Sequence, residues 1–283
     1  MISEAELRRN AGAMGMDPMI QDLDYVLGVF LSEWYREEEG RVLRFKGGTC
    51  LRKCYFQDHR FSKDLDFTAE LDLEQETIDG LLTRVSQRTQ ASFGLNLVER
   101  EWRRRIVQDQ HGGTTIEIRL YYRGPLRRTG APQAIQLHIT TPESEYLSPT
   151  KSEQKIIHPY SDAVLLEEVI VPCYTLQEIL SEKLRALCGQ RRFAISRDVF
   201  DVYKLVTEGQ VEFYGMDDLL QRKFEIKGIP FQDIIPDHIE ARREQFEQDW
   251  FRDLQHLLPA SQETTFEQAW NVTIETISRI VFA

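Results

Sequence analysis

A pair of glycines followed by a pair of aspartates constrains this chain more than any other feature of its sequence. Gly47 and Gly48 end an apolar run, and Asp64 and Asp66 stand inside an apolar frame that begins at Phe61. Glycine lets a backbone approach an anion closely, and a helix that begins at such a turn presents its amide groups to that anion. The glycine turn therefore predicts a phosphate site.

The aspartate pair predicts a metal site on a strand. If residues 63–68 form a strand, Asp64 and Asp66 project from one face while Leu65 and Phe67 point into the core. The two carboxylates then lie roughly 6 to 7 Å apart, which allows them to clamp one or two divalent cations. An isolated glycine pair is usually a turn, and an isolated Asp-x-Asp is usually a solvated strand or loop. Together, these neighbouring features favour a site for nucleotide chemistry.

Composition and length indicate a globular protein of a reducing compartment. The chain has 283 residues, of which 41% are hydrophobic and 29% charged, so it can form one large domain or two modest ones. Its four cysteines follow neither the spacing of a zinc motif nor that of a small secreted domain. The N-terminal acids do not suit a signal peptide, and no apolar run reaches about 18 residues. We therefore expect a cytoplasmic protein without a membrane span.

Charge is unevenly distributed along the chain. The net charge of −11 argues against a protein covered in basic surface for binding nucleic acid. Between residues 84 and 128, however, ten arginines and four acids leave a local excess of six positive charges. That excess is enough for a patch that contacts a phosphate backbone. The alternative is that Arg103, Arg104 and Arg105 protect a solvated strand edge from pairing, and the sequence favours neither interpretation.

Hydrophobic periodicity predicts a mixed region followed by a helical one. In the first region we expect helices at 17–38, 48–56 and 73–93 and strands at 41–46, 63–68, 95–107, 114–122 and 133–140. The strand, helix and strand that open this region are typical of a βαβ unit or a close relative of it. Residues 142–172 are rich in turns. In the second region we expect helices at 175–188, 196–207, 216–223, 235–257 and 263–281.

A lysine on an apolar helix face gives a second group of candidate residues. Lys183 shares that face with leucines, which is unexpected unless it reaches solvent or meets an anion. Asp198 lies in the first turn of the next predicted helix, three residues before Asp201. The simple explanations are a salt bridge for Lys183 and complementarity to the helix dipole for Asp198. With the glycine turn and the paired acids, however, these groups are the parts that nucleotidyl transfer needs.

Four segments carry a more specific signal. They are Lys46-Gly-Gly-Thr-x-Leu-x-Lys53, Arg60-Phe-Ser-x-Asp-Leu-Asp-Phe67, Glu182-Lys-Leu-Arg-Ala-Leu187 and Arg197-Asp-Val-x-Asp-Val-Tyr203, in this order. Together they resemble the motifs of the AbiEii toxin family of nucleotidyltransferases, the group that includes the MenT toxins. The resemblance covers residues 45–204. It implies an α/β (α+β) fold, with a polymerase-β-like nucleotidyltransferase core built on a mixed sheet and followed by a helical C-terminal bundle.

The resemblance also implies domains and roles for the matching residues. Residues 1–170 would form the catalytic domain, and residues 171–283 a helical domain that contributes Lys183 and Asp198 to the site. Gly47, Gly48 and Thr49 would hold the nucleoside triphosphate, Arg60 and Ser62 would support it, Asp64 and Asp66 would bind Mg²⁺, Lys183 would contact phosphate, and Asp198 would act as the catalytic acidic residue. The resemblance further implies the toxin of a toxin–antitoxin or phage-defence pair, with a cognate antitoxin as partner.

One departure from the wider superfamily concerns the metal site. Its members often supply a third metal-binding carboxylate from a later central strand, but the predicted strand 133–140 offers only Gln136 and His138 on the relevant face. Glu117 is one substitute. Otherwise the second metal is weakly held or Asp198 takes part of the work. A histidine such as His138 is more often a satisfied core or surface residue than a ligand.

We therefore expect a magnesium-dependent nucleotidyltransferase that transfers a nucleoside monophosphate from a nucleoside triphosphate to an RNA hydroxyl. The resemblance points to the 3′ end of tRNA, which characterised relatives modify. Two alternatives stay open. The acceptor can be a protein or a small molecule, or the chain can be a catalytically silent protein that binds a nucleotide or a partner.

Overall fold

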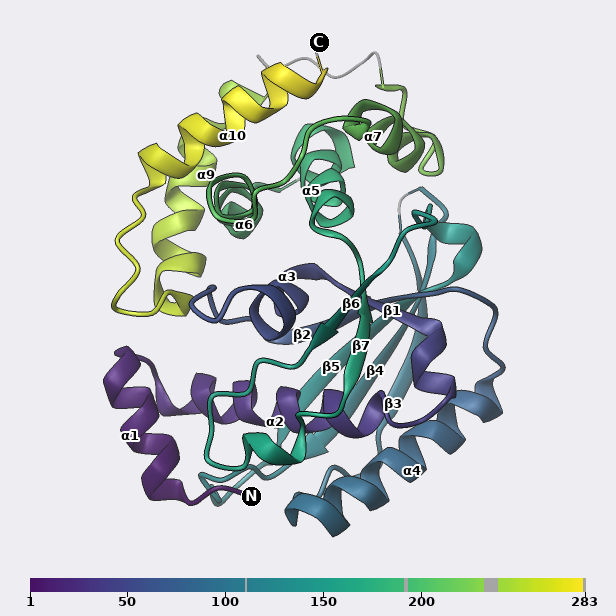
Figure 1. Ribbon diagram of the computed structural model, residues 1–283, viewed down its shortest axis with the longest axis vertical. Helices are drawn as coiled ribbons and strands as arrows, with labels where there is room; N and C mark the ends of the chain where they lie inside the picture. The colour runs from purple at the N-terminus through teal and green to yellow at the C-terminus, as the bar shows by residue number, and fades with distance from the viewer. Residues whose placement is uncertain (110, 191–192, 232–238, 282–283) are drawn as a thin grey trace. The chain divides into compact units, whose positions relative to one another are not determined.

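The computed structural model describes residues 1–109, 111–190, 193–231 and 239–281 (Figure 1). The chain packs into two compact units. The first comprises Met1–Leu147, Lys151–Cys173 and Pro259–Ser261, and the second comprises Ser148–Thr150, Tyr174–Leu258 and Gln262–Ala283. The predicted boundary lies after residue 170, whereas the first unit continues to Cys173. The two units also exchange two short segments, Ser148–Thr150 and Pro259–Ser261. The assignment of separate functional domains stays a prediction.

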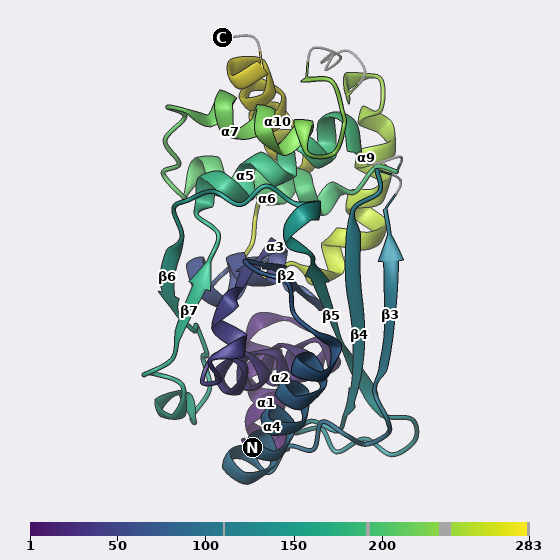
Figure 2. The same ribbon diagram turned by 90° about the vertical axis from the view of Figure 1, so that its right-hand side faces the viewer.

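The first unit contains a mixed sheet of seven strands among its described residues. Its strands are β1 (Leu43–Lys46), β2 (Asp64–Ala69), β3 (Arg103–Gln108), β4 (Thr114–Tyr122), β5 (Gln133–Thr140), β6 (Ser152–Lys155) and β7 (Ile170–Cys173). They lie in the order β3-β4-β5-β2-β1-β7-β6, and Figure 2 shows β3 and β6 at the two edges. The β2 strand runs parallel to β5 and antiparallel to β1, so it lies inside the sheet.

The opening strands do not form a βαβ unit. Phe45 lies opposite Phe67 and Lys46 opposite Asp66, in an antiparallel pairing of β1 with β2. The chain therefore enters β2 at the end of the sheet where it left β1. Side-chain alternation decides which face of a sheet a residue takes, but it does not decide the direction of the strand. For this reason the sequence pattern did not distinguish parallel pairing, as in a βαβ unit, from the antiparallel pairing of β1 with β2.

Helices of the first unit pack on this sheet and on each other. They are α1 (Glu4–Met14), α2 (Pro18–Trp34), α3 (Gly47–Cys50) and α4 (Gln75–Phe93), with short helical turns at η1 (Glu39–Val42), η2 (Leu51–Tyr55), η3 (Pro142–Ser144) and η4 (Ala163–Leu165). Helices α2 and α4 lie side by side (Figures 1 and 2). Trp34 stacks on Phe67 with ring centroids 5.7 Å apart, and Phe45 lies 5.3 Å from the same ring. These aromatic contacts pack β2 against α2 and against its neighbour β1.

Several boundaries differ from the sequence predictions. The helix predicted from residue 17 begins as expected, with Asp17 accepting a hydrogen bond from the Met19 amide, but it ends at Trp34 rather than at residue 38. Helix α1 was not predicted. The strand predicted from residue 95 begins only at Arg103, and before it Val98 makes a single bridge to Tyr121. The β6 and β7 strands lie in the stretch predicted to be turns, because strands of four residues are too short to show periodicity.

The second unit is helical in its described part. Its elements are α5 (Leu176–Arg185), η5 (Ala186–Gln190), α6 (Ser196–Thr207), α7 (Met216–Glu225), α9 (Arg243–Asp249), η7 (Trp250–Leu254), η8 (Gln255–Leu257) and α10 (Phe266–Val281). The start of the helix predicted at 235–257 lies outside the described residues, and the rest is divided among three shorter elements. No helix in the described part of the chain has the length and apolar character needed to cross a membrane.

Asp22 is a buried carboxylate of α2 whose ionisation opposes folding. Its Oδ1 accepts a hydrogen bond of 2.9 Å from the Leu126 amide, while its Oδ2 has no hydrogen-bond partner among the described residues. Burial raises the pKa of Asp22 from 3.8 to about 6, against the opposing effects of the Leu126 amide and Arg128. Because the pKa is higher in the folded state, folding favours the protonated carboxyl group of Asp22. The stability that this protonation contributes is fully present below the unfolded pKa and is lost as the pH rises through about 6.

We therefore expect Asp22→Asn to raise the free energy of unfolding by about 2 kcal/mol at pH 8 and to change it little at pH 4. Asparagine removes the charge and keeps an oxygen for the Leu126 amide. Urea denaturation at both pH values measures the effect, and Asp72→Asn controls for the change in net charge because Asp72 is exposed. An equal gain at both pH values would contradict the account.

Candidate active site

The glycine turn is pressed against two of the predicted site residues. Gly47 has a φ of +78°, and a Cβ atom there would lie 2.5 Å from Oδ2 of Asp66. A Cβ atom on Gly48 would lie 2.4 Å from Nη2 of Arg60. A side chain at either glycine would therefore have to displace Asp66 or Arg60, and Gly47 is also favoured by its backbone conformation. The turn brings its backbone next to an acid and a guanidinium, as a phosphate site beside a metal site requires.

Thr49 joins the helix that follows this turn to strand β2. Its hydroxyl donates a hydrogen bond of 2.5 Å to the backbone carbonyl of Asp64, and its side chain is buried. Its predicted contact with a triphosphate would therefore have to come from its backbone amide, in the first turn of α3. Arg60 is buried beneath Gly48, and Ser62 is half-buried in the segment that leads into β2. The binding roles of Thr49, Arg60 and Ser62 stay predictions.

The two aspartates alternate with core residues as the sequence predicted. Leu65 and Phe67 are fully buried, whereas Asp64 and Asp66 are half-buried on the other face of β2. Oδ1 of Asp66 lies 3.0 Å from Nδ1 of His138 on the neighbouring strand. This hydrogen bond to Asp66 raises the pKa of His138 although burial lowers it. The two carboxylates therefore lie on one accessible face of β2, and the imidazole of His138 orients that of Asp66.

A buried ion network anchors the helix that carries the turn. Asp24 of α2 accepts hydrogen bonds from Arg52 at 2.6 Å and from Lys53 at 2.7 Å, and all three side chains are buried. The hydroxyl of Tyr160 also donates to Asp24, at 2.9 Å. Although burial raises the pKa of Asp24, the two cations hold it well below its usual value. Sequence analysis missed Asp24, and the available signal was an acid on the apolar face of a predicted helix.

Strand register continues the polar face across the sheet in two rows. In the first row Asp64 lies beside Gln136, then Arg119, then Arg103; in the second row Asp66 lies beside His138, then Glu117, then Arg105. Residues directly opposite each other on paired strands share a face. The acid pair on β2 and the arginines of β3 and β4 therefore belong to one continuous surface.

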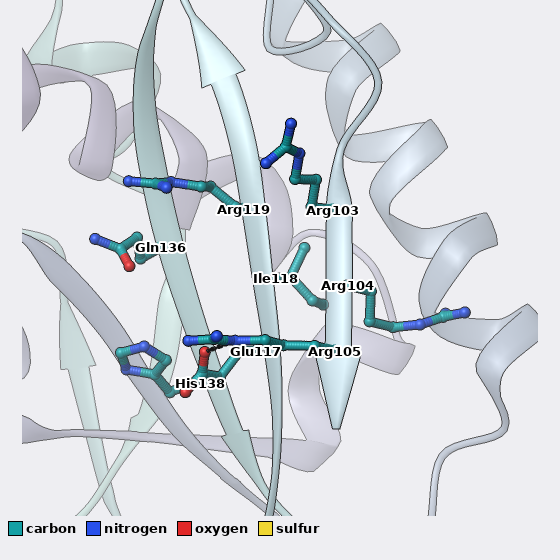
Figure 3. A pocket seen from close by; sticks show the side chains of 8 residues that line it. All are labelled: Arg103, Arg104, Arg105, Glu117, Ile118, Arg119, Gln136 and His138. Atoms are coloured by element: carbon teal, nitrogen blue, oxygen red, sulfur yellow. Dashed lines mark hydrogen bonds and ion pairs between the residues drawn. The ribbon is translucent and has the colours of Figure 1, made fainter. Parts of the chain in front are cut away.

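A cavity of about 320 Å³ lies on this surface, over β3, β4 and β5 (Figure 3). Figure 3 shows Arg105 and Glu117 meeting beside His138, and their ion pair measures 2.5 Å. Arg104 points away from these residues and pairs with Asp79 of α4 at 2.9 Å. The arginine run therefore lies on an edge strand, as the second interpretation expected, and contact with a phosphate backbone stays a prediction. Arg103, Arg104 and Arg105 all line the cavity, but the guanidinium of Arg104 is directed to Asp79 rather than to Glu117 and His138.

Glu117 does not replace the missing third carboxylate. It is separated from Asp66 by the whole of β5, and two strand spacings amount to roughly 10 Å. It is also paired with Arg105. The position directly beside Asp66 belongs to His138, which the sequence analysis regarded as an ordinary histidine. Among the described residues, this imidazole is the group that holds Asp66 from the neighbouring strand.

Lys183 and Asp198 meet in the second unit, where helix α5 packs on α6. Nζ of Lys183 lies 2.7 Å from Oδ1 of Asp198 and 2.8 Å from Oδ2 of Asp201. The side chains of Lys183, Asp198 and Asp201 are only 12%, 3% and 0% exposed. The salt bridge considered as a simple explanation is therefore present, and Asp201 joins it because it lies one turn after Asp198. The catalytic roles of Lys183 and Asp198 stay predictions.

The approach of Gly47 to Asp66 can be tested with a matched glycine. Gly47 and Gly94 both have a positive φ, but a Cβ atom on Gly94 meets nothing within 4 Å in the described structure. We expect alanine at either position to cost about 1 to 2 kcal/mol of stability, measured by urea denaturation. Only Gly47→Ala should displace Asp66 and weaken Mn²⁺ binding, by at least about tenfold in an electron paramagnetic resonance titration. Equal Mn²⁺ affinities in the two variants would show that the contact does not position Asp66.

Comparisons with known proteins show the family and the fold of the chain. A sequence model described as nucleotidyl transferase AbiEii toxin, type IV toxin–antitoxin system, matches residues 29–272. The fold is similar to that of MenT4, a nucleotidyltransferase toxin from Mycobacterium tuberculosis H37Rv, with a TM-score of 0.54 and 19% sequence identity over 100% of this chain and 97% of that one. No curated protein sequence matches the chain.

The fold comparison confirms the predicted fold class, an α/β core on a mixed sheet followed by helices. The family match extends over most of the chain and includes all four motifs. Members of the AbiEii and MenT families are NTP-dependent nucleotidyltransferases. The chain therefore belongs to the AbiEii family and is a nucleotidyltransferase toxin of a type IV toxin–antitoxin system.

Proposed function

We propose that this toxin uses Mg²⁺ to transfer a nucleoside monophosphate from a nucleoside triphosphate to an RNA hydroxyl in the cytoplasm. The first candidate for the acceptor is the 3′ end of tRNA. The observation that carries the proposal is the single polar face on which the acid pair, the glycine turn and the arginine-lined cavity meet. A cognate antitoxin is the expected protein partner, as the toxin–antitoxin family implies.

The donor atoms of the acid pair fit a magnesium ion. Mg²⁺ prefers oxygen ligands and is commonly held by one or two carboxylates together with substrate phosphates. Asp64 and Asp66 offer such carboxylates from one face of β2. When bound there, Mg²⁺ would stabilise negative charge on the α-phosphate and favour deprotonation of the attacking hydroxyl.

The chain's own residues would bind and orient the triphosphate. The backbone amides at the start of α3 can donate hydrogen bonds to phosphate oxygens. The guanidinium of Arg60 lies beneath Gly48, so its positive charge favours an anion at the turn. His138 holds Asp66 through the hydrogen bond at 3.0 Å and so limits the rotation of that carboxylate. Lys183 and Asp198 are proposed, from their motifs, to contact phosphate and to accept the proton of the attacking hydroxyl.

The arginines of the cavity favour RNA as the acceptor. Arg103 and Arg119 are exposed, and no ion pair is found for either among the described residues. They continue the row that begins at Asp64, so phosphates of a bound strand would lie next to the reacting hydroxyl. One observation favours the alternative of a small-molecule acceptor. The cavity of about 320 Å³ is of the size that small ligands occupy.

A labelling assay separates these acceptors. Purified protein is incubated with Mg²⁺, total tRNA and each labelled nucleoside triphosphate in turn. We expect label on tRNA with the unmodified chain, and a loss of at least about a hundredfold with Asp66→Asn, because a neutral amide binds Mg²⁺ poorly. Glu153→Gln is the matched control, since Glu153 is an exposed acid on β6. Full transfer by Asp66→Asn would contradict the metal assignment. Release of pyrophosphate with no label on tRNA would favour another acceptor.

The arginine row gives a separate prediction for RNA binding. We expect Arg103→Ala and Arg119→Ala each to weaken tRNA binding and to reduce the slope of log K against log salt by about 0.7, the value for one lost phosphate contact. Arg104→Ala is the control because Arg104 points to the opposite face and pairs with Asp79. Fluorescence anisotropy at several salt concentrations measures the slopes. An equal change in all three variants would indicate a general charge effect rather than a binding row.

A further inference from the structure

Three cysteines that are far apart in the sequence converge in the first unit. Cys50 and Cys54 lie on the helix formed by α3 and η2, and Cys173 lies at the end of β7. Their sulfur atoms all lie within 4.8 Å of one another. All three residues are buried, with 0%, 5% and 0% of their surface exposed, and none forms a disulfide. The sequence spacing of these cysteines is not that of a zinc motif, but the fold brings their three thiol groups together.

The placement of these thiols follows from the elements that carry them. Cys50 and Cys54 are four residues apart, so they lie on the same face of the helix. Cys173 pairs with Phe45 across β1 and β7, which brings it beneath that face. An isolated buried cysteine packs as a small apolar side chain and needs no partner. Here, by contrast, three sulfur atoms lie close together, so their lone pairs can all be donated to one ion placed between them.

Charge around the cluster also favours deprotonated sulfur at one member. Burial raises the pKa of Cys54, but hydrogen bonds from Cys173 and Cys50, together with the ammonium group of Lys53, lower it below its ordinary value. Burial raises the pKa of the Cys50 and Cys173 thiols. Because the thiolate is the form of cysteine that binds metals, the direction of the pKa shift at Cys54 suits a ligand, and the convergence of the three sulfur atoms carries the argument.

We propose that Cys50, Cys54 and Cys173 form a binding site for a thiophilic d¹⁰ cation of the Zn²⁺ class. Bonds of about 2.3 Å from each sulfur to the ion place the sulfur atoms roughly 4 Å apart, a separation compatible with three sulfur atoms that all lie within 4.8 Å of one another. Each thiol that binds loses its proton to solvent, so binding of one ion releases up to about three protons. Carboxylates and soft thiolates select different ions, so this site is chemically distinct from the acid pair.

Occupancy of this site would fasten the helix behind the glycine turn to β7. Cys50 directly follows Thr49, whose hydroxyl holds the same helix to β2. An ion that bound only the folded chain would stabilise it by mass action. The inference does not depend on the proposed function, because it concerns residues that neither hold the triphosphate nor bind Mg²⁺ in that proposal.

The test is a titration of the full-length, reduced protein with Cd²⁺ in the presence of excess Mg²⁺, which occupies hard oxygen sites. We expect an ultraviolet thiolate-to-metal absorption that saturates at one ion per chain, with a raised unfolding temperature. Cys54→Ser should reduce the affinity at least about a hundredfold, because one of three ligands is lost. Cys188→Ser is the matched control, since Cys188 lies in the second unit.

Two further measurements keep the outcome decisive. Cys173→Ala tests the same site from β7 if Cys54→Ser fails to fold, and circular dichroism establishes the folding of each variant. At a Cd²⁺ concentration that just saturates the unmodified chain, proton release, measured with a pH indicator in weak buffer, should fall strongly in either variant and persist in Cys188→Ser. No thiolate absorption in the unmodified chain would overturn the proposal, as would absorption that persists at full strength in a folded Cys54→Ser or Cys173→Ala chain.

Discussion

The register of β2 between β1 and β5 is the constraint on which the candidate site depends. Leu65 and Phe67 are fully buried, so the strand cannot move by one residue without exposing them and burying both aspartates. With this register fixed, Asp66 lies opposite Lys46 on one side and His138 on the other. The polar surface then extends strand by strand to the arginines of β3. Hydrophobic burial on one face of the sheet therefore fixes the chemistry on the other.

Buried ion networks position the helices that carry the remaining candidate groups. Asp24 binds Arg52 and Lys53 behind the glycine turn, and Lys183 lies between Asp198 and Asp201 in the second unit. A buried charge that loses its partner costs several kcal/mol, about 3 to 5 in measured cases. Each network therefore holds its helix in one position. The same argument means that a loss of activity in a variant of Lys183 needs a separate measurement of folding before it is assigned to catalysis.

Sequence alone predicted the local parts of this site well, because alternation and helix periodicity depend on neighbouring residues. Such patterns account for the glycine turn, the start of α2, and the placement of Asp64 and Asp66 on the face opposite Leu65 and Phe67. Long-range pairing was beyond the same patterns. They did not indicate that β1 and β2 are antiparallel, that His138 rather than Glu117 lies beside Asp66, or that Cys173 meets Cys50 and Cys54. These features depend on strand direction and tertiary packing, which a periodicity does not contain.

The most direct test of the account is a crystal structure of the protein with Mn²⁺ and a non-hydrolysable nucleoside triphosphate analogue. The account predicts an anomalous peak for manganese within bonding distance of Asp64 and Asp66, with the triphosphate against the backbone of Gly47 and Gly48. Phosphates held elsewhere, or manganese bound away from both aspartates, would contradict the assignment of this face as the site of nucleotidyl transfer.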